Sequence, residues 1–347
     1  MKIRKFNWKT IVITLSITTL STIAWAWGSW GHHYINHAAI LSLPDPLRTF
    51  FYNHADFITE ESVVPDIRKY TIGDKAEFPR HYIDLEDYGA DAVHTLPKSF
   101  NEAEEKFGAE ELTKKGTLPW TINEMEAKLT DAFRKKSKNE IIFLAATLGH
   151  YIGDANMPLH TSSNHNGQLT DQKGIHALFE GEMLEMFGKT INLNMGSAPC
   201  FKDVNQTTWD MIEATHAAAD TLLKAEADLR KIFPKRNIYR LDSADRVVKN
   251  QYGDWYFSDD YVKTLHQNLD GLLERRFRAA IYYTSGFWYT AWVNAGKPDL
   301  SDLDDEATTK CNQKILKKEL KLWKKGKTFN LKPVPEFKLI NSDHAHD

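Results

Sequence analysis

The strongest hydrophobic pattern in the chain lies in residues 139–154. Residues 141–148 read I-I-F-L-A-A-T-L, which leaves almost no polar side on a helix. A helix that is apolar all round is buried inside the protein. His150 and Asp154 follow four residues apart, so they share one face of the same helix. The pattern therefore predicts a buried helix that begins near Asn139 and holds an imidazole and a carboxylate rigidly.

Apolar residues recur at helical spacing in several other parts of the chain. These segments are residues 34–43, 47–58, 98–115, 122–134, 203–231, 258–294 and 310–325. The sequence has no alternating strand pattern, glycine-rich phosphate loop or internal repeat. We therefore predict an all-α fold, in which a predominantly helical single domain surrounds the buried helix.

The first 26 residues have the pattern of a secretory signal peptide. A basic start precedes an apolar run at residues 11–23, and Ala24 and Ala26 supply the small residues that a signal peptidase reads. An uncleaved membrane anchor is the alternative, but the run is short for a membrane span and contains Ser and Thr. We predict cleavage before Trp27, which gives a secreted or periplasmic protein. The main domain then covers residues 27–300.

Residues 301–347 form a separate C-terminal part in this prediction, with a basic helix and a loose tail. The helix at 310–325 carries lysines beside apolar residues, so it could lie on an anionic membrane, although a solvated terminal helix is the simpler interpretation.

The composition of the chain adds few constraints on its function. A hydrophobic content of 42% and a charged content of 26% are those of a soluble globular protein. A net charge of −3 gives no electrostatic reason to expect tight binding to duplex nucleic acid.

Residues 150–180 contain two pairs of candidate metal ligands, and a single candidate histidine lies between the pairs. His150 and Asp154 form one pair, His176 and Glu180 form another at the same spacing, and His160 lies between them. A lone pair of this kind is usually a solvated polar face. Two pairs with a histidine between them favour a zinc site, because imidazole and carboxylate together suit zinc. The polar loop 161–173, which contains His165, must then pass over the site. Cys200 and Cys311 are far from these residues in sequence, and the sequence leaves open whether they pair.

With these ligands the chain resembles the superfamily of zinc-dependent phospholipase C and single-strand-specific nucleases. The pattern of that superfamily is an N-terminal Trp, an early His, a loop Asp, a His, His-x3-Asp-x5-His and a final His-x3-Asp or Glu. Matching residues occur here in the same order: Trp27, His32, Asp66, His81, His150, Asp154, His160, His176 and Glu180. Taken alone, Asp66 reads as a turn residue and His81 as a half-buried histidine, but the ordered match leads us to expect both as ligands.

The resemblance implies three zinc ions. The first would be bound by Asp66, His81, His150 and Asp154; the second by His160, His176 and Glu180; the third by His32, Asp154 as a bridge, and the amino nitrogen and carbonyl oxygen of Trp27. It also implies a phosphodiesterase in which a zinc-bound hydroxide attacks phosphorus and Asp66 orients or deprotonates the water. Trp27 can supply its amino nitrogen only after the signal peptide is removed.

The substrate of this expected phosphodiesterase is less constrained. The short gap from His160 to His176 and the final Glu180 favour the phospholipase C branch, because the nuclease branch has a longer insert there and ends in Asp. The rings of Trp30, Phe78 and Tyr82 could surround a choline headgroup or stack on an unpaired base. We therefore expect a monomeric phospholipase C-like enzyme that could contact a membrane peripherally. Two alternatives remain. These are a single-strand-specific nuclease acting on RNA or single-stranded DNA, and a secreted metal-binding module without activity.

Overall fold

The computed structural model describes residues 28–249 and 255–326 of the chain. It is 71% helical and has no strand among the described residues, so the predicted all-α class is confirmed. Isolated antiparallel bridges join Tyr239 to Phe257, Leu241 to Val247 and Lys249 to Trp255. The predicted signal peptide, Trp27 and the end of the predicted tail lie outside the described residues.

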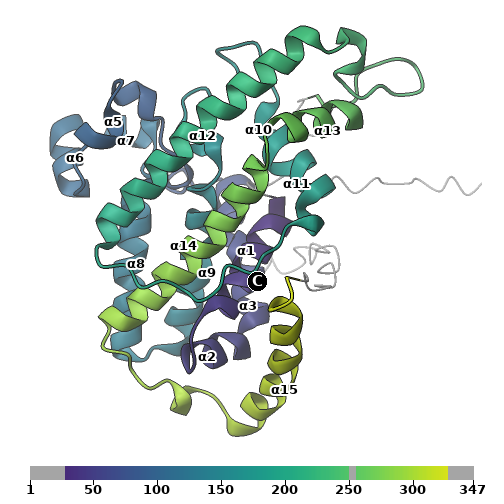
Figure 1. Ribbon diagram of the computed structural model, residues 1–347. Helices are drawn as coiled ribbons and strands as arrows, with labels where there is room; N and C mark the ends of the chain where they lie inside the picture. Colours follow the sequence, from purple (N-terminus) through teal and green to yellow (C-terminus); the bar gives the residue numbers. More distant parts are fainter. Residues whose placement is uncertain (1–27, 250–254, 327–347) are drawn as a thin grey trace, which may run out of the picture.

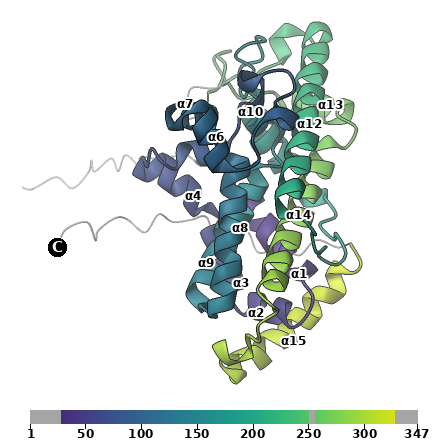
Figure 2. The same ribbon diagram turned by 90° about the vertical axis from the view of Figure 1, so that its left-hand side faces the viewer.

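The α-helices follow one another along the chain with both short and long connections. Their bounds are α1 Gly28–Ser42, α2 Leu47–Asn53, α3 Ala55–Glu60, α4 Val64–Asp66, α5 Ala92–Thr95, α6 Phe100–Phe107, α7 Ala109–Lys115, α8 Leu118–Lys135, α9 Lys138–Asp154, α10 Ile175–Ala177, α11 Met183–Phe187, α12 Val204–Ile232, α13 Asp259–Asn268, α14 Leu272–Asn294 and α15 Glu306–Trp323. Figure 1 shows α12 and α14 as the long helices that cross the molecule, with α15 beneath α2. Turned by 90°, α12 and α14 lie on one side of α8 and α9, and α4 lies on the other (Figure 2).

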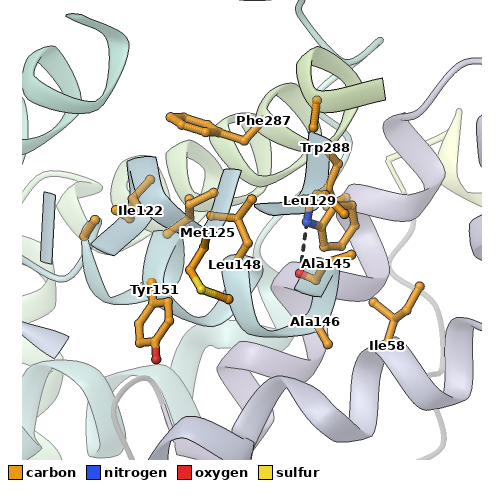
Figure 3. Close-up of a cluster of buried hydrophobic side chains, with 14 of the residues drawn as sticks. Ile58, Ile122, Met125, Leu129, Ala145, Ala146, Leu148, Tyr151, Phe287 and Trp288 are labelled. Carbon is orange, nitrogen blue, oxygen red and sulfur yellow. Dashed lines mark hydrogen bonds between the residues drawn. The ribbon is translucent and has the colours of Figure 1, made fainter. Parts of the chain in front are cut away.

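Helix α9 is the predicted buried helix, and it lies in the centre of the main core. Its apolar residues pack between α8 and α14, so that no side of the helix faces solvent along residues 145–154. Figure 3 shows Leu148 and Ala145 of α9 among Met125, Leu129 and Trp288, whose indole Nε1 donates a hydrogen bond of 3.0 Å to the carbonyl oxygen of Ala145. That bond satisfies the one polar atom of a fully buried tryptophan.

Two glycines let α1 approach α9 closely. A Cβ atom on Gly149 would lie 2.0 Å from Oδ1 of Asn36, and one on Gly153 would lie 2.9 Å from the ring of His32. The Asn36 amide donates to the carbonyl oxygens of Ile58 and Ala146, each at 3.2 Å, which links α1 to α3 and α9. Helix α1 therefore has a fixed register against α9, and this register determines where His32 lies.

Some sequence predictions about local structure are wrong in detail. The helices expected at 47–58 and 98–115 are each divided into two helices, α2 with α3 and α6 with α7. Asp66 was expected on a loop, but it ends the short helix α4 and is followed by a π-helical turn at Ile67–Ile72. The helix expected at 258–294 is interrupted between α13 and α14. Gly271 there has a φ angle of +75°, in the left-handed region that glycine tolerates best.

The C-terminal helix α15 packs against α2 and adds to the main core. Leu316 and Trp323 are buried, whereas the lysines of this helix face solvent, which is the pattern of a terminal helix with one solvated side. Cys200 and Cys311 are exposed and unpaired. Among residues 28–249 and 255–326, no helix has the length and apolar character needed to cross a membrane.

Candidate metal centre

Four buried side chains from three segments meet near the C-terminal end of α9, and we call them the first group: Asp66, His81, His150 and Asp154. His81 Nδ1 lies 2.9 Å from Asp154 Oδ2 and 3.7 Å from Asp66 Oδ1. His150 Nε2 lies 3.2 Å from the same Asp154 oxygen and 3.9 Å from Asp66 Oδ1. Ligand atoms bound tetrahedrally to one zinc ion are roughly 3.4 Å apart, given the usual bond lengths. The first group thus has the spacing of one zinc site.

The second group consists of His160, His176 and Glu180. His176 Nε2 lies 3.1 Å from Glu180 Oε1, and His160 Nε2 lies 3.7 Å from Glu180 Oε2. The two imidazole rings are stacked with their centroids 5.1 Å apart. Glu180 stands on a π-helical turn at Leu178–Glu182, a distortion that often marks functional sites.

Asp154 connects these residues to a third group, formed by His32 and Asp154. His32 Nε2 lies 3.6 Å from Asp154 Oδ1, and its ring stacks on that of His150 at a centroid distance of 4.0 Å. His160 Nδ1 approaches the same Oδ1 atom at 3.5 Å, while Oδ2 faces the first group. Each oxygen of Asp154 therefore faces a different set of imidazoles, which is the arrangement of a bridging carboxylate.

The polar atoms that meet here are buried and lack ordinary partners. Among the described residues, both ring nitrogens of His32, both carboxylate oxygens of Asp66, Asp154 Oδ1 and His160 Nδ1 have no hydrogen-bond partner. Leaving polar atoms unsatisfied inside a protein costs free energy, so the arrangement fits bound cations. Ligand atoms close enough to share an ion occur in three sets: His32, His150 and Asp154; Asp66, His81 and His150; His160, His176 and Glu180. All the predicted ligands except Trp27, which lies outside the described residues, occur in them.

The outer ring nitrogens of two histidines are held by other parts of the chain, and that of His81 lies beside a carboxylate. His150 Nδ1 lies 2.8 Å from the Ser62 carbonyl oxygen, and His176 Nδ1 lies 3.0 Å from that of His165. His81 Nε2 lies 3.4 Å from Glu77 Oε1, and the Tyr151 hydroxyl donates to the same Glu77 oxygen. Such contacts fix the tautomer and orientation of a metal-binding imidazole. Sequence reasoning missed Glu77, although its spacing of four residues before His81 was a usable signal.

The pKa values of these groups reflect burial and mutual charge. Burial raises the pKa of Asp66 to about 6, although the neighbouring histidines oppose that shift. Burial would lower the pKa of His150, but the carboxylates of Asp154 and Asp66 outweigh it and raise the pKa to about 8. Burial holds the pKa of His32 and that of His160 well below the usual value, so these imidazoles are neutral and able to donate a lone pair.

The three predicted substrate-binding rings have different surroundings. Trp30 is half-buried, with its ring stacked on Tyr34 at a centroid distance of 3.9 Å. Tyr82 is also half-buried, and its hydroxyl donates to the carbonyl oxygen of Lys114 at 3.0 Å. Phe78 is 40% exposed and is the most accessible of the three. The structure therefore leaves Phe78 as the ring that is freest to contact a ligand.

A cationic and aromatic cluster that the sequence did not indicate lies beside Phe78. Tyr70 is 47% exposed and meets Phe78 edge to face at a centroid distance of 6.3 Å. Lys69 Nζ lies 4.7 Å from the centre of the Tyr70 ring and 5.7 Å from that of Phe78. Lys69 is also near enough for its charge to act on Asp66, His160 and His176. The ammonium group of Lys69 thus lies near both the metal-ligand groups and two exposed rings.

Comparison with known proteins gives a match to one family model. Residues 27–183 match the model described as S1/P1 Nuclease, and this range contains every predicted ligand. No curated protein matches the chain. The family is zinc-dependent, which agrees with the buried imidazole and carboxylate groups described above. Residues 27–183 thus match a family of the zinc-dependent phospholipase C and nuclease superfamily, and this match indicates a zinc-dependent phosphodiester hydrolase.

Proposed function

We propose that the chain binds three zinc ions and hydrolyses single-stranded nucleic acid. The first group would bind one ion and the second group another. His32 and Asp154 would bind the third together with the N-terminal residue Trp27. The observation that carries this proposal is the position of Asp154, because its two oxygens face different sets of unpaired or imidazole nitrogens. A single ion would leave several of these buried atoms unsatisfied.

When bound, zinc supplies Lewis acidity and makes water acidic enough to ionise near neutral pH. The residues of the chain provide the rest of the chemistry. Asp66 has two carboxylate oxygens without hydrogen-bond partners, so it can orient the attacking water and accept its proton. Lys69 contributes a positive charge beside the ligand groups, which attracts and orients a phosphodiester anion.

The nucleic-acid substrate is supported by the family model and by the exposed rings of Tyr70 and Phe78. Exposed aromatic rings beside a cation can stack on unpaired bases while the cation contacts the backbone. The bases of a duplex are already stacked on one another and are not available for such contacts. We therefore expect a strong preference for single strands over duplexes.

Phospholipase C activity is the second candidate, since Glu180 and the short connection from His160 to His176 favour that branch. Two apolar side chains also face solvent in the segments beside the ligands: Ile72 is 71% exposed and Leu169 is 70% exposed. Side chains of this kind can enter the boundary of a lipid bilayer. If the protein is a phospholipase C, we expect these side chains to make a peripheral contact with the membrane.

One assay separates the two candidates. Mature protein beginning at Trp27 would be loaded with zinc and given single-stranded DNA, single-stranded RNA, duplex DNA and phosphatidylcholine vesicles in parallel. We expect rapid cleavage of the single strands, loss of activity with a chelator, and loss of activity in Asp66→Asn. Rapid release of headgroups without cleavage of single strands would instead establish the phospholipase candidate. Zinc binding without activity on any of these substrates would favour the inactive metal-binding module.

We also propose that the protein is exported and acts as a monomer after cleavage before Trp27. The support for export is the basic, apolar and small-residue pattern of residues 1–26. N-terminal sequencing of protein recovered outside the producing cells tests the cleavage position, and light scattering tests the oligomeric state. A first residue other than Trp27 would contradict both the cleavage and the assignment of Trp27 as a ligand.

A further inference from the structure

Gln172 is buried in a loop whose neighbouring residues are exposed. The loop connects His160 to His176, and residues 168–171 and Lys173 on either side of Gln172 face solvent. Gln172 itself is only 1% exposed. A polar side chain is buried in this way only if its hydrogen bonds are satisfied, so its partners indicate why it is turned inward.

The partner of Gln172 is a fully buried carboxylate on α12. Its amide Nε2 donates to Glu226 Oε2 at 2.6 Å and to the Leu223 carbonyl oxygen at 2.8 Å. Its Oε1 atom accepts a hydrogen bond of 2.6 Å from the Thr170 hydroxyl in the same loop. Gln172 is therefore bonded on one side to the loop and on the other side to a long helix.

Glu226 is held rigidly by Arg230 of the same helix and by Tyr261 of α13. The Tyr261 hydroxyl of α13 donates to Glu226 Oε1 at 2.7 Å, and Arg230 Nε donates to the same oxygen at 2.9 Å. Glu226 is 0% exposed, and the guanidinium of Arg230 supplies the charge that a buried carboxylate needs. Glu226, which anchors the loop, is thus a buried carboxylate with its hydrogen bonds and its ion pair formed, and not a mobile surface group.

The same loop holds the outer nitrogen of His176. The His165 carbonyl oxygen lies 3.0 Å from His176 Nδ1, and the Gly174 amide donates to Asn166 Oδ1 at 3.0 Å. The side chain of His176 is 25% exposed, whereas that of His160 is 5% exposed. Surrounding side chains therefore constrain His176 less than His160, and the orientation of its ring depends more on the loop.

We propose that the Gln172–Glu226 hydrogen bond is a positioning device for the second group. It fixes the loop, the loop places the carbonyl oxygen of His165, and that oxygen orients the imidazole of His176 toward the metal. The inference rests on the proposed function to the extent that the second group binds zinc. Neither residue belongs to the candidate ligand sets, so both act through His176.

The test uses Gln172→Ala in the full mature protein loaded with zinc. Glu226 keeps Tyr261 and Arg230 in this variant, so the core between α12 and α13 should remain folded. Chelator competition should show one of the three zinc ions bound about 10-fold or more weakly, since loss of an outer partner of a ligand has an effect of this size. The other two ions should bind as before.

Gln206→Ala is the matched control, because it removes a glutamine–carboxylate hydrogen bond of 2.7 Å to Asp210 on the exposed side of α12.

A reversed pair gives a readout that a general loss of stability would not produce. Gln172→Glu places two carboxylates together and should weaken the same zinc ion, whereas adding Glu226→Gln restores one donor and one acceptor and should recover much of its affinity. Equal affinity of all three ions in wild type and Gln172→Ala would overturn the proposal. Failure of the wild type to bind zinc through His176 would instead overturn the proposed metal site, and the positioning role with it.

Discussion

At the scale of single residues, Glu77 is predicted to orient His81 within the first group. Glu77 is 4% exposed, lies 3.4 Å from His81 Nε2 and accepts a hydrogen bond from Tyr151. Glu77→Gln should weaken zinc binding by the first group by about 10- to 100-fold, the usual effect of losing such a partner. Chelator competition measures the affinity, and Glu124→Gln, which alters an exposed carboxylate near Arg80, is the control. Unchanged affinity in Glu77→Gln would show that packing alone orients His81.

A second prediction at this scale concerns the dependence of stability on pH. Burial, together with the charges of Asp87 and Glu86, raises the pKa of Asp84 to about 7. The folded protein therefore binds this proton more tightly than the unfolded chain, and stability is lost as pH rises from about 4 to 7. Asp84→Asn should raise the melting temperature at pH 8 and change it little at pH 4. Asp56→Asn, which changes an exposed carboxylate, is the control, and an equal effect of Asp84→Asn at both pH values would contradict the prediction.

At the scale of elements, the contact between α1 and α9 is predicted to control the third group. A Cβ atom on Gly153 would lie 2.9 Å from both Cε1 and Nδ1 of His32, so in Gly153→Ala either the His32 ring or the two helices must shift. Overpacking of this kind costs about 1–3 kcal/mol. We expect a lower melting temperature and selective loss of the zinc ion bound by His32. Gly181→Ala is the control, because a Cβ atom there meets nothing within 4 Å. Full zinc content in Gly153→Ala would show that the interface adapts.

At the scale of the whole molecule, export and metal assembly are predicted to be coupled. Helix α1 begins at Gly28 and carries His32, so a chain that begins at Trp27 starts one residue before this helix. A free α-amino group can chelate zinc once deprotonated, whereas a peptide nitrogen cannot. Protein with one extra Gly before Trp27 should bind the third ion more weakly and keep the other two. Equal zinc content and turnover in the two forms would exclude Trp27 as a ligand.

The sequence by itself determined the helical class and the types of residue in the candidate site. Both follow from local sequence patterns. Apolar periodicity predicts α9, and the spacing of His150 and Asp154 places them on one helix face. The order of the remaining candidates along the chain then indicated the superfamily. Local patterns failed where tertiary contacts decide the backbone, as at Asp66 and at the break before Gly271.

The superfamily resemblance implied how the candidate ligands are grouped, but only the tertiary structure brings each group together. Asp66 and His81 are far from His150 in sequence, and the packing of separate segments around α9 brings them together. The same packing gives Asp154 an oxygen for each neighbouring group, turns Gln172 inward onto Glu226, and leaves Cys200 and Cys311 unpaired. These features depend on contacts between segments that are distant in the chain. Hydrophobic periodicity shows which side of a helix is buried, but not which helix covers it.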